Sequence, residues 1–431
     1  MNVLCRGNVL LLMKQVDFGG IILNNPHSIH TSKKLKLTRN TWFLLIGIIF
    51  IASTLRSPLT SVGPLISSIR DSLAISNVLA GFLTTIPLLA FALISPFAPK
   101  IARRFGMELT LFVSLILLTA GIIIRSLGTT PNLLIGTFLI GLAIAFGNVL
   151  LPGLIKLNFP LHIGLITGIY SVSMNLSASI AVGVSVPLAH ETQFGWEGAL
   201  GIWALLTFIA LLVWLPQLKN KRLPSSVKMI AEKAKSPSLW RSPLAWSVTF
   251  FMGFQSLIFY TTSAWMPEVL NTQGISPDSA GWMVSLLQFS QLPMTFIVPI
   301  LAGKVKDQRW IVAGVAILYL LGYGGIMVGG TSLVPLWMIM IGVAGGAAFG
   351  LSMMFFSLRT RTPHEAADLS GMAQSFGYAL AAIGPVLFGL LHDFTSGWTV
   401  PMLIIIGGIL IVFLSGMKAG KYNFVTSEEN K

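Results

Sequence analysis

The sequence predicts an all-α polytopic membrane protein with twelve transmembrane helices. The chain is 54% hydrophobic and only 10% charged, whereas a soluble domain carries about 25% charged residues. Twelve apolar segments lie between about residues 42 and 417, each near the roughly 20 residues that cross a bilayer core. Barrel strands would instead alternate apolar and polar residues over about ten positions. The expected spans are 42–68, 77–98, 108–127, 131–151, 161–189, 197–215, 244–270, 278–301, 310–329, 333–356, 368–391 and 397–416.

The distribution of Lys and Arg predicts the orientation of these spans. Basic residues occupy every second gap, and only Arg70 and Arg125 fall in gaps on the other side. Because Lys and Arg are retained on the cytoplasmic face during insertion, we expect both termini to be cytoplasmic. The net charge of +14 is then the sum of loops that face anionic lipid headgroups. We therefore expect membrane lipid as a partner and no nucleic acid.

A basic loop between the sixth and seventh spans divides the chain in two. The expected organisation is a cytoplasmic N-terminal tail (1–40), a six-helix half (41–216), a cytoplasmic central loop (217–240), a second six-helix half (241–417) and a cytoplasmic C-terminal tail (418–431). The single cysteine, Cys5, lies in the first tail. We expect no intrachain disulfide, no cysteine-based metal site and no cofactor.

The two halves resemble each other at a constant offset of 203 residues. Matching pairs include Pro64 and Pro267, Pro96 and Pro299, Gly147 and Gly350, Lys156 and Arg359, Pro160 and Pro363, and Gly168 and Gly371. A duplication of this kind is typical of transporters whose halves rock around a central site.

This pattern resembles the major facilitator superfamily. The superfamily signature Gly-x-x-x-Asp-Arg-x-Gly is partly kept in Pro99–Gly106, which retains Arg104 and Gly106. In the second half, Gly303–Arg309 retains the Gly and Asp307. The resemblance implies the major facilitator fold and a monomer, with Arg104 and Asp307 as gating residues of the cytoplasmic loops.

Three shorter stretches look like the bacterial cyanate and 2-nitroimidazole transporter family. They are Leu55-Arg-Ser-Pro-Leu-Thr-Ser-Val-Gly-Pro64, Gly147-Asn-Val-Leu-Leu-Pro152 and Thr167-Gly-Ile-Tyr-Ser171. The likeness implies a multi-pass protein of the bacterial plasma membrane. It also implies a small-molecule solute that is cyanate-like or nitroimidazole-like.

Arg56 is the most informative single residue. It lies about 15 residues into the first span, roughly 21 Å from the cytoplasmic edge at about 1.5 Å per residue. A charge there costs at least about 2.5–3.5 kcal/mol. One interpretation is a structural pairing with backbone carbonyls. The other is a cationic anchor for an anionic or strongly dipolar solute, which suits the planar fork of Arg. No carboxylate is expected at comparable depth, which favours the anchor.

Polar residues at mid-span are the next candidates. Either helix–helix hydrogen bonding or solute contact explains each of them. The resemblance favours Asn148, Gln255, Tyr260 and Gln288 as cavity-lining residues; the others are Asn175, Gln291, Gln374 and Tyr378.

Two further patterns are interpreted as structural. Gly342, Gly346 and Gly350 repeat every four residues and predict close helix packing. The stretch 364–368 is interpreted as a capping and interfacial segment.

The sequence as a whole predicts a secondary transporter, and not an enzyme, that moves a small anionic or polar organic solute by alternating access. An exporter of drugs or metabolites is the alternative within the superfamily, and a membrane-embedded enzyme is a weaker alternative. The solute, the direction of transport and the coupling ion stay open.

Overall fold

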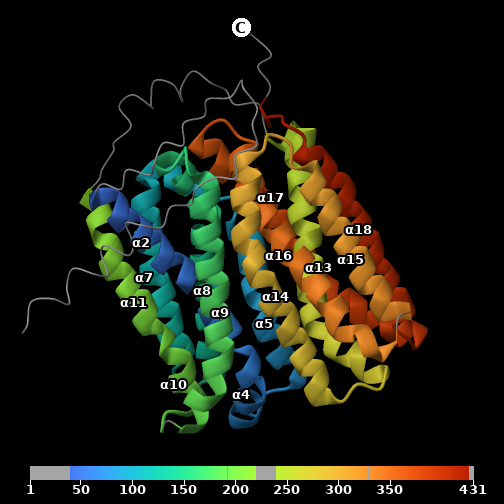
Figure 1. Cartoon of the computed structure of the whole chain (residues 1–431). Helices are drawn as coiled ribbons and strands as arrows, with labels where there is room; N and C mark the ends of the chain where they lie inside the picture. The colour runs from blue at the N-terminus through green and yellow to red at the C-terminus, as the bar shows by residue number, and fades with distance from the viewer. Residues whose placement is uncertain (1–38, 192, 220–238, 329, 427–431) are drawn as a thin grey trace, which may run out of the picture. The chain divides into compact units, whose positions relative to one another are not determined.

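The computed structural model describes residues 39–191, 193–219, 239–328 and 330–426 (Figure 1). Cys5, most of the predicted tail 1–40 and most of the predicted loop 217–240 lie outside these ranges. Within them every regular element is a helix. The helices are α2 (Arg39–Thr54), α3 (Ser57–Thr60), η1 (Gly63–Leu65), α4 (Ile66–Leu73), α5 (Asn77–Ile94), α6 (Ala98–Phe105), α7 (Met107–Arg125), α8 (Thr130–Asn158), α9 (Ile163–Glu191), α10 (Gly195–Gly201), α11 (Trp203–Trp214), η2 (Leu215–Lys219), η3 (Leu239–Arg241), α13 (Pro243–Thr272), α14 (Pro277–Lys304), α15 (Arg309–Val328), η4 (Thr331–Leu333), α16 (Val334–Leu358), α17 (Pro363–Thr395) and α18 (Thr399–Gly420).

The number of membrane-spanning helices agrees with the sequence prediction. Eleven stretches of the described chain are long and apolar enough to cross a membrane, and α5 with α6 forms a twelfth span that bends by 57°. Pro96 and Pro99 lie at this bend, and proline cannot continue the helical hydrogen-bond ladder. The all-α, twelve-span fold class is therefore confirmed. The bounds proposed for the two halves and the tails stay predictions.

Side-chain caps explain where several helices begin. The Ser76 hydroxyl accepts a hydrogen bond from the backbone N–H of Leu79 at the start of α5, and Ser276 does the same at the start of α14. Thr362 and Glu365 form a capping box at the start of α17. That box confirms the interpretation of 364–368 as a capping segment. It also explains why α17 begins five residues before the predicted span.

Glycine packing joins α14 and α16. A Cβ added to Gly342 would lie 2.2 Å from the Leu287 carbonyl oxygen, and one added to Gly346 would lie 2.2 Å from the Gln291 carbonyl oxygen. No other residue type fits at these distances, so the predicted close approach along α16 is confirmed.

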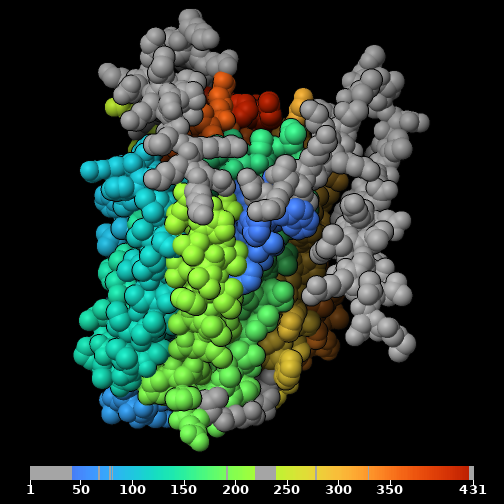
Figure 2. Space-filling view, turned by 90° about the vertical axis from the view of Figure 1, so that its left-hand side faces the viewer, coloured from blue at the N-terminus to red at the C-terminus, as the bar shows by residue number. Residues whose placement is uncertain are grey.

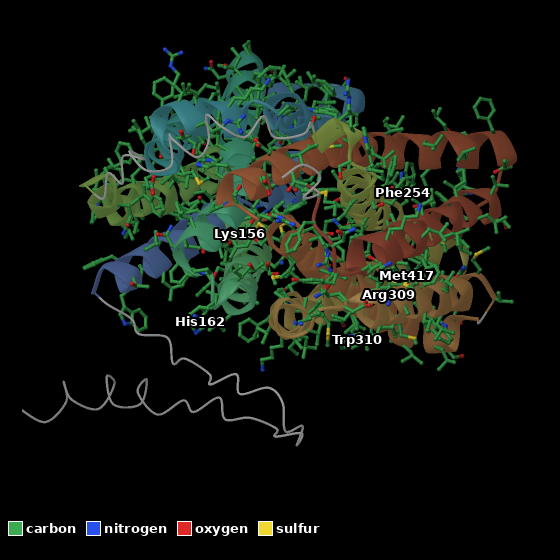
Figure 3. All side chains as sticks on the ribbon, turned by 90° about the horizontal axis from the view of Figure 1, so that it is seen from above. Lys156, His162, Phe254, Arg309, Trp310 and Met417 are labelled. Carbon is green, nitrogen blue, oxygen red and sulfur yellow. The ribbon has the colours of Figure 1, made fainter. Side chains whose placement is uncertain are left out.

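Helices of the first six spans also approach those of the last six closely. A Cβ on Gly164 of α9 would lie 2.4 Å from the Pro299 carbonyl oxygen of α14. One on Gly371 of α17 would lie 2.7 Å from the Ser95 carbonyl oxygen, next to α5. Both contacts lie toward the end of the bundle that carries Lys156, which Figure 3 views from above. We call this the predicted cytoplasmic end.

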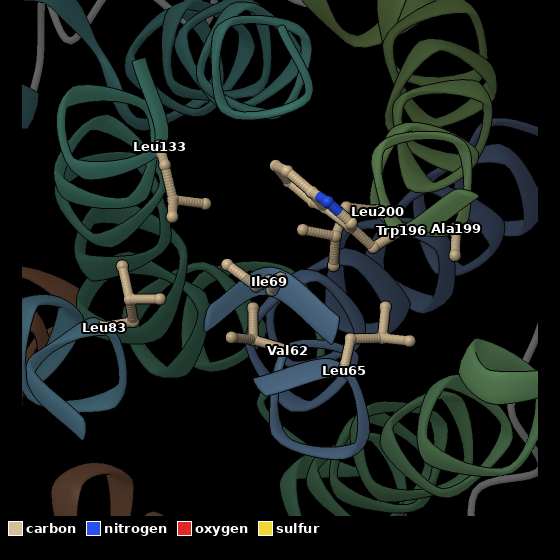
Figure 4. Close-up of a cluster of buried hydrophobic side chains, with 8 residues drawn as sticks. All are labelled: Val62, Leu65, Ile69, Leu83, Leu133, Trp196, Ala199 and Leu200. Atoms are coloured by element: carbon tan, nitrogen blue, oxygen red, sulfur yellow. The ribbon is translucent and has the colours of Figure 1, made fainter. Parts of the chain in front are cut away.

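The other end of the first six spans is held by an apolar cluster (Figure 4). Trp196 and Leu200 of α10 pack with Leu133 of α8 and with Leu65 and Ile69 around α4. The outer surface is apolar too. Figure 2 shows α11 along one flank, where Leu205, Phe208 and Leu212 are at least half exposed. In a membrane-spanning chain such a surface is the lipid contact.

Candidate functional site

The first span is interrupted at Arg56. Helix α2 ends at Thr54, and α3 begins at Ser57 with Pro58 in its first turn. Hydroxyl groups donate hydrogen bonds to the carbonyl oxygens that lose their helical N–H donors at the interruption. Thr54 Oγ1 donates to the Ile51 carbonyl at 2.7 Å, and Ser57 Oγ donates to the Ser53 carbonyl at 2.8 Å. The serine- and threonine-rich sequence around Arg56 therefore stabilises a break in the middle of a membrane span.

The guanidinium of Arg56 is bound by neutral groups from both sets of helices. Its Nη1 donates to Asn175 Oδ1 of α9 at 2.9 Å. Its Cζ lies 5.6 Å from the ring centre of Phe259 on α13 and 5.0 Å from that of Phe349 on α16. Among the described residues no carboxylate forms an ion pair with Arg56. A cation at this depth is thus held by one amide and two aromatic faces, without a balancing negative charge.

Arg56 lines a cavity between the two sets of six spans. The free space inside it is about 10 Å³ in this conformation, roughly what one water molecule needs. Its lining is aromatic and polar, and consists of Arg56, Gln255, Ser256, Phe259, Tyr260, Gln291, Gly345, Phe349 and Tyr378. All of these except Arg56 come from α13, α14, α16 and α17. Four of the nine lining residues are aromatic and four others are polar, and such a mixture of aromatic and convergent polar groups is typical of solute sites.

The predicted lining residues divide into two groups. Arg56, Gln255 and Tyr260 line the cavity, and Gln255 Nε2 donates to the Met252 carbonyl at 3.1 Å. Asn148 and Gln288 are not among the lining residues: the Asn148 side chain is buried in α8, and Gln288 is exposed on α14. Their roles as solute contacts stay predictions.

Gln291, one turn after Gln288, does line the cavity. Both amides are mid-span residues of the same helix, and composition does not separate them. No sequence signal separates them, because the packing of α14 against Gly345 and Gly346 of α16 places Gln291 at the cavity.

Arg125 lies elsewhere than the sequence indicated. The charge pattern placed it in an outer gap, but it is the last residue of α7 and its side chain is completely buried. Its Nη1 donates to the Pro58 carbonyl at 2.6 Å. This carbonyl lacks its usual helical donor, because the backbone N–H of Val62 donates to the Leu59 carbonyl and not to that of Pro58. Arg125 thus replaces a missing backbone donor two residues after Arg56.

At the predicted cytoplasmic end, Lys156 joins the two sets of helices. The Lys156 Nζ of α8 donates to the Ser357 carbonyl at 2.7 Å and to Thr360 Oγ1 at 2.9 Å, and it also contacts the Thr360 carbonyl. These groups close the C-terminal end of α16, where a cation is favourable. Arg103 adds an exposed ion pair with Asp368 of α17 at 2.5 Å.

The two predicted gating residues have local partners. Arg104 is exposed, and its Cζ lies 5.3 Å from the ring centre of Phe105. Asp307 pairs with Arg309 at 2.6 Å in its own loop, and hydrogen bonds from Arg309 lower the pKa of the Asp307 carboxyl. In this structure it is Arg103, not Arg104, that reaches across to the other set of helices. Gating by Arg104 and Asp307 stays a prediction.

Arg359, the counterpart of Lys156 at the 203-residue offset, is bound within its own set of helices. It donates to the carbonyl oxygens of Ala419 and Gly420 at the end of α18 and to the side chain of Gln308. Burial lowers the pKa of Arg359 to about 10, and Asp307 partly offsets the shift. The two cations at equivalent positions therefore have different roles: Lys156 joins the two sets of helices, and Arg359 bonds within one set.

Comparison with known proteins agrees with this architecture. The sequence profile of the Major Facilitator Superfamily matches residues 42–385. The chain is 47% identical to the uncharacterized transporter YycB of Bacillus subtilis (strain 168), over 94% of this chain and 98% of that one. It is 42% identical to the 2-nitroimidazole transporter of Escherichia coli (strain K12), over 89% and 96%.

More distant comparisons point the same way. The cyanate transport protein CynX of Escherichia coli (strain K12) is 24% identical over 85% of this chain and 96% of its own. Among solved structures, the proton:xylose symporter XylE superposes with a TM-score of 0.70 at 14% identity, over 90% of this chain and 98% of that one. With twelve spans, a profile match over most of its length and full-length relatives above 40% identity, the chain belongs to the Major Facilitator Superfamily as a multi-pass membrane transporter.

Proposed function

We propose that the protein carries a small organic solute with an anionic or strongly polar group across the bacterial plasma membrane, and that Arg56 binds that group. The observation that supports the proposal is a mid-membrane cation that faces a cavity without a carboxylate partner among the described residues. Among the described residues, only the Nη1 nitrogen of the guanidinium has a hydrogen-bond partner. The others are free for the two-bond geometry that Arg forms with a carboxylate or a nitro group.

The relatives narrow the solute class in the same direction. One is named as a transporter of 2-nitroimidazole and a more distant one as a cyanate transport protein. Both named solutes are small and present electron-rich atoms to a cation. The higher identity belongs to the first, so 2-nitroimidazole is the better starting probe. The protein is proposed to act as a transporter without a catalytic step.

We further propose alternating access between two six-helix halves (41–216 and 241–417), with both termini in the cytoplasm. Because the cavity is lined by Arg56 from the first half and by four helices of the second, relative movement of the halves would open it to either side. The contacts of Lys156 and of Arg103 with the second half would then hold the cytoplasmic side closed.

The test is binding of 2-nitroimidazole and of cyanate to the purified protein in lipid nanodiscs. Arg56→Gln is expected to weaken binding by at least about tenfold, or about 1.4 kcal/mol, while the variant still folds. Arg56→Lys should keep the charge but bind less tightly than wild type, because it loses the planar fork.

Arg70→Gln is the matched control, since Arg70 is exposed next to Asp71 and away from the cavity. Unchanged affinity of a folded Arg56→Gln variant for a solute that the wild type binds would remove Arg56 from the site. Proteoliposome uptake with and without a pH gradient then measures whether solute transport is coupled to protons.

A further inference from the structure

Gln291 brings an unpartnered acceptor to the cavity. Its side chain is only 6% exposed, and its Oε1 accepts no hydrogen bond from any described residue. The residue opposite this oxygen is Gly345, which has no side chain to cover it. A Cβ added there would be in van der Waals contact, 3.7 Å from Gln291 Oε1 and 3.4 Å from the Tyr319 hydroxyl.

The position of this amide is fixed by the backbone. Gly346 brings α16 so close to the Gln291 carbonyl that no larger side chain fits between them. The packing that joins α14 to α16 therefore holds the start of the Gln291 side chain in place. A buried acceptor without a donor is unfavourable, and native structures rarely keep one unless a ligand or an ordered water completes it.

Other donors line the cavity, but no described residue donates a hydrogen bond to this oxygen. The Gln255 amide nitrogen is already used, since it donates to the Met252 carbonyl and to Ser256 Oγ at 2.7 Å. Arg56 donates from Nη1 to Asn175, and neither Arg56 nor the hydroxyls of Tyr260 and Tyr378, which line the same cavity, bond to Gln291 Oε1. The cavity thus presents a strong donor, Arg56, together with an acceptor that lacks its donor.

We propose that Gln291 Oε1 accepts a hydrogen bond from an N–H or O–H group of the solute, and so selects solutes that carry a donor as well as an electron-rich group. This inference rests on the proposed function, in which Arg56 binds the electron-rich end. Phe259, Tyr260, Phe349 and Tyr378 line the same space, and aromatic side chains pack well against an aromatic ring. The solute class is a small planar ring with an acceptor group and a separate donor.

Discrimination of this kind is expected to be strong. A site that hydrogen-bonds a substrate N–H or O–H group rejects an analogue without it, because the buried polar group of the protein is left unpaired. We expect loss of the donor to weaken binding by at least about tenfold, which is about 1.4 kcal/mol. A linear anion without a donor, such as cyanate, should bind less tightly than a ring that carries one.

The experiment compares two ligand pairs on the purified full-length protein in nanodiscs. The pairs are 2-nitroimidazole with 1-methyl-2-nitroimidazole, and 4-hydroxybenzoate with benzoate. For each pair that binds, the affinity of wild type for the donor-bearing member should be at least about tenfold higher. Gln291→Met, which keeps the length of the side chain and removes the acceptor, should reduce that preference to about twofold or less. It should do so by weakening only the donor-bearing member.

Gln288→Met is the matched control, because Gln288 is on the same helix, is exposed and lies outside the cavity. Its preference should equal that of wild type. Equal affinity of wild type for both members of a pair overturns the inference whether or not Gln291→Met folds, and leaves the proposed function standing. Absence of binding by all four compounds and by cyanate counts instead against the proposed solute class. A preference that survives in Gln291→Met assigns the selection to another residue.

Discussion

Replacement of Arg125 by Met is expected to weaken solute binding without loss of folded protein. The side chain of Arg125 is completely buried at the end of α7. Its Nη1 donates to the Pro58 carbonyl at 2.6 Å, whereas Nε and Nη2 have no partner among the described residues. Met is unbranched and adaptable, and it fills the same region without a charge.

The expected stability change follows from these contacts. The lost charge-assisted hydrogen bond contributes about 1.5–3 kcal/mol, and each buried donor without a partner costs about 1–3 kcal/mol. Removing two such donors offsets the lost bond. The free energy of unfolding of Arg125→Met should therefore stay within about 1 kcal/mol of wild type or exceed it.

Solute binding, unlike the free energy of unfolding, is expected to become less favourable. Without Arg125, the Pro58 carbonyl keeps only a 3.3 Å hydrogen bond from Ser61 Oγ, so the break that holds Arg56 becomes less rigid. A loss of about 1 kcal/mol in the placement of Arg56 corresponds to roughly five- to tenfold weaker binding.

Two measurements check the prediction, and neither needs a solute. Thermal unfolding of the purified protein should show an unchanged or higher midpoint. In a background with Cys5 replaced by Ser, a thiol introduced by Gly345→Cys should react faster with anionic than with cationic methanethiosulfonates, because Arg56 attracts the anion. Arg125→Met should reduce this rate ratio, and exposed Arg70→Met should not. A lower unfolding midpoint with an unchanged ratio would refute the reasoning, since Arg125 would then stabilise the fold alone.

The remaining predictions concern the contacts between helices. Lys156→Met removes its hydrogen bonds to Ser357 and Thr360, so a thiol introduced by Ser357→Cys should react about tenfold faster with a reagent added from the predicted cytoplasmic side; an unchanged rate would contradict the role of Lys156. Asp368→Asn breaks an exposed pair with Arg103, and a double-mutant cycle on unfolding should give a coupling below about 1 kcal/mol. A larger coupling would show that the pair is shielded from solvent. Gly346→Leu should abolish folded protein in a size-exclusion assay, because its Cβ would lie 2.2 Å from a carbonyl oxygen of α14; a monodisperse variant would mean that the two helices separate easily.

Much of the fold could be predicted from the sequence because hydrocarbon imposes length and polarity limits on every span. The same limits made Arg56 conspicuous, since a charge at mid-span needs a specific reason. The glycine repeat of α16 was equally readable, because close backbone approach excludes every larger residue. Each of these features is visible at one position or at one spacing.

Other parts of the site depend on tertiary geometry that periodicity does not contain. Gln288 and Gln291 are chemically identical and one turn apart, and the packing of α14 against α16 places only Gln291 at the cavity. Arg125 was assigned to an outer loop because charge counting ignores burial. Its partner, Pro58, lies 67 residues earlier in the chain. Pairings at such separations require the packed structure.

The unequal roles of Lys156 and Arg359 bear on how tightly the protein holds its solute. Lys156 bonds across the two sets of helices, whereas Arg359 bonds within one. Under the proposed alternating-access cycle, Lys156 therefore adjusts the fraction of molecules whose cavity is presented to a given side. Apparent affinity is the intrinsic affinity reduced by that fraction. One residue far from the solute can thus set the concentration range over which the transporter responds, while the chemistry of the cavity stays the same.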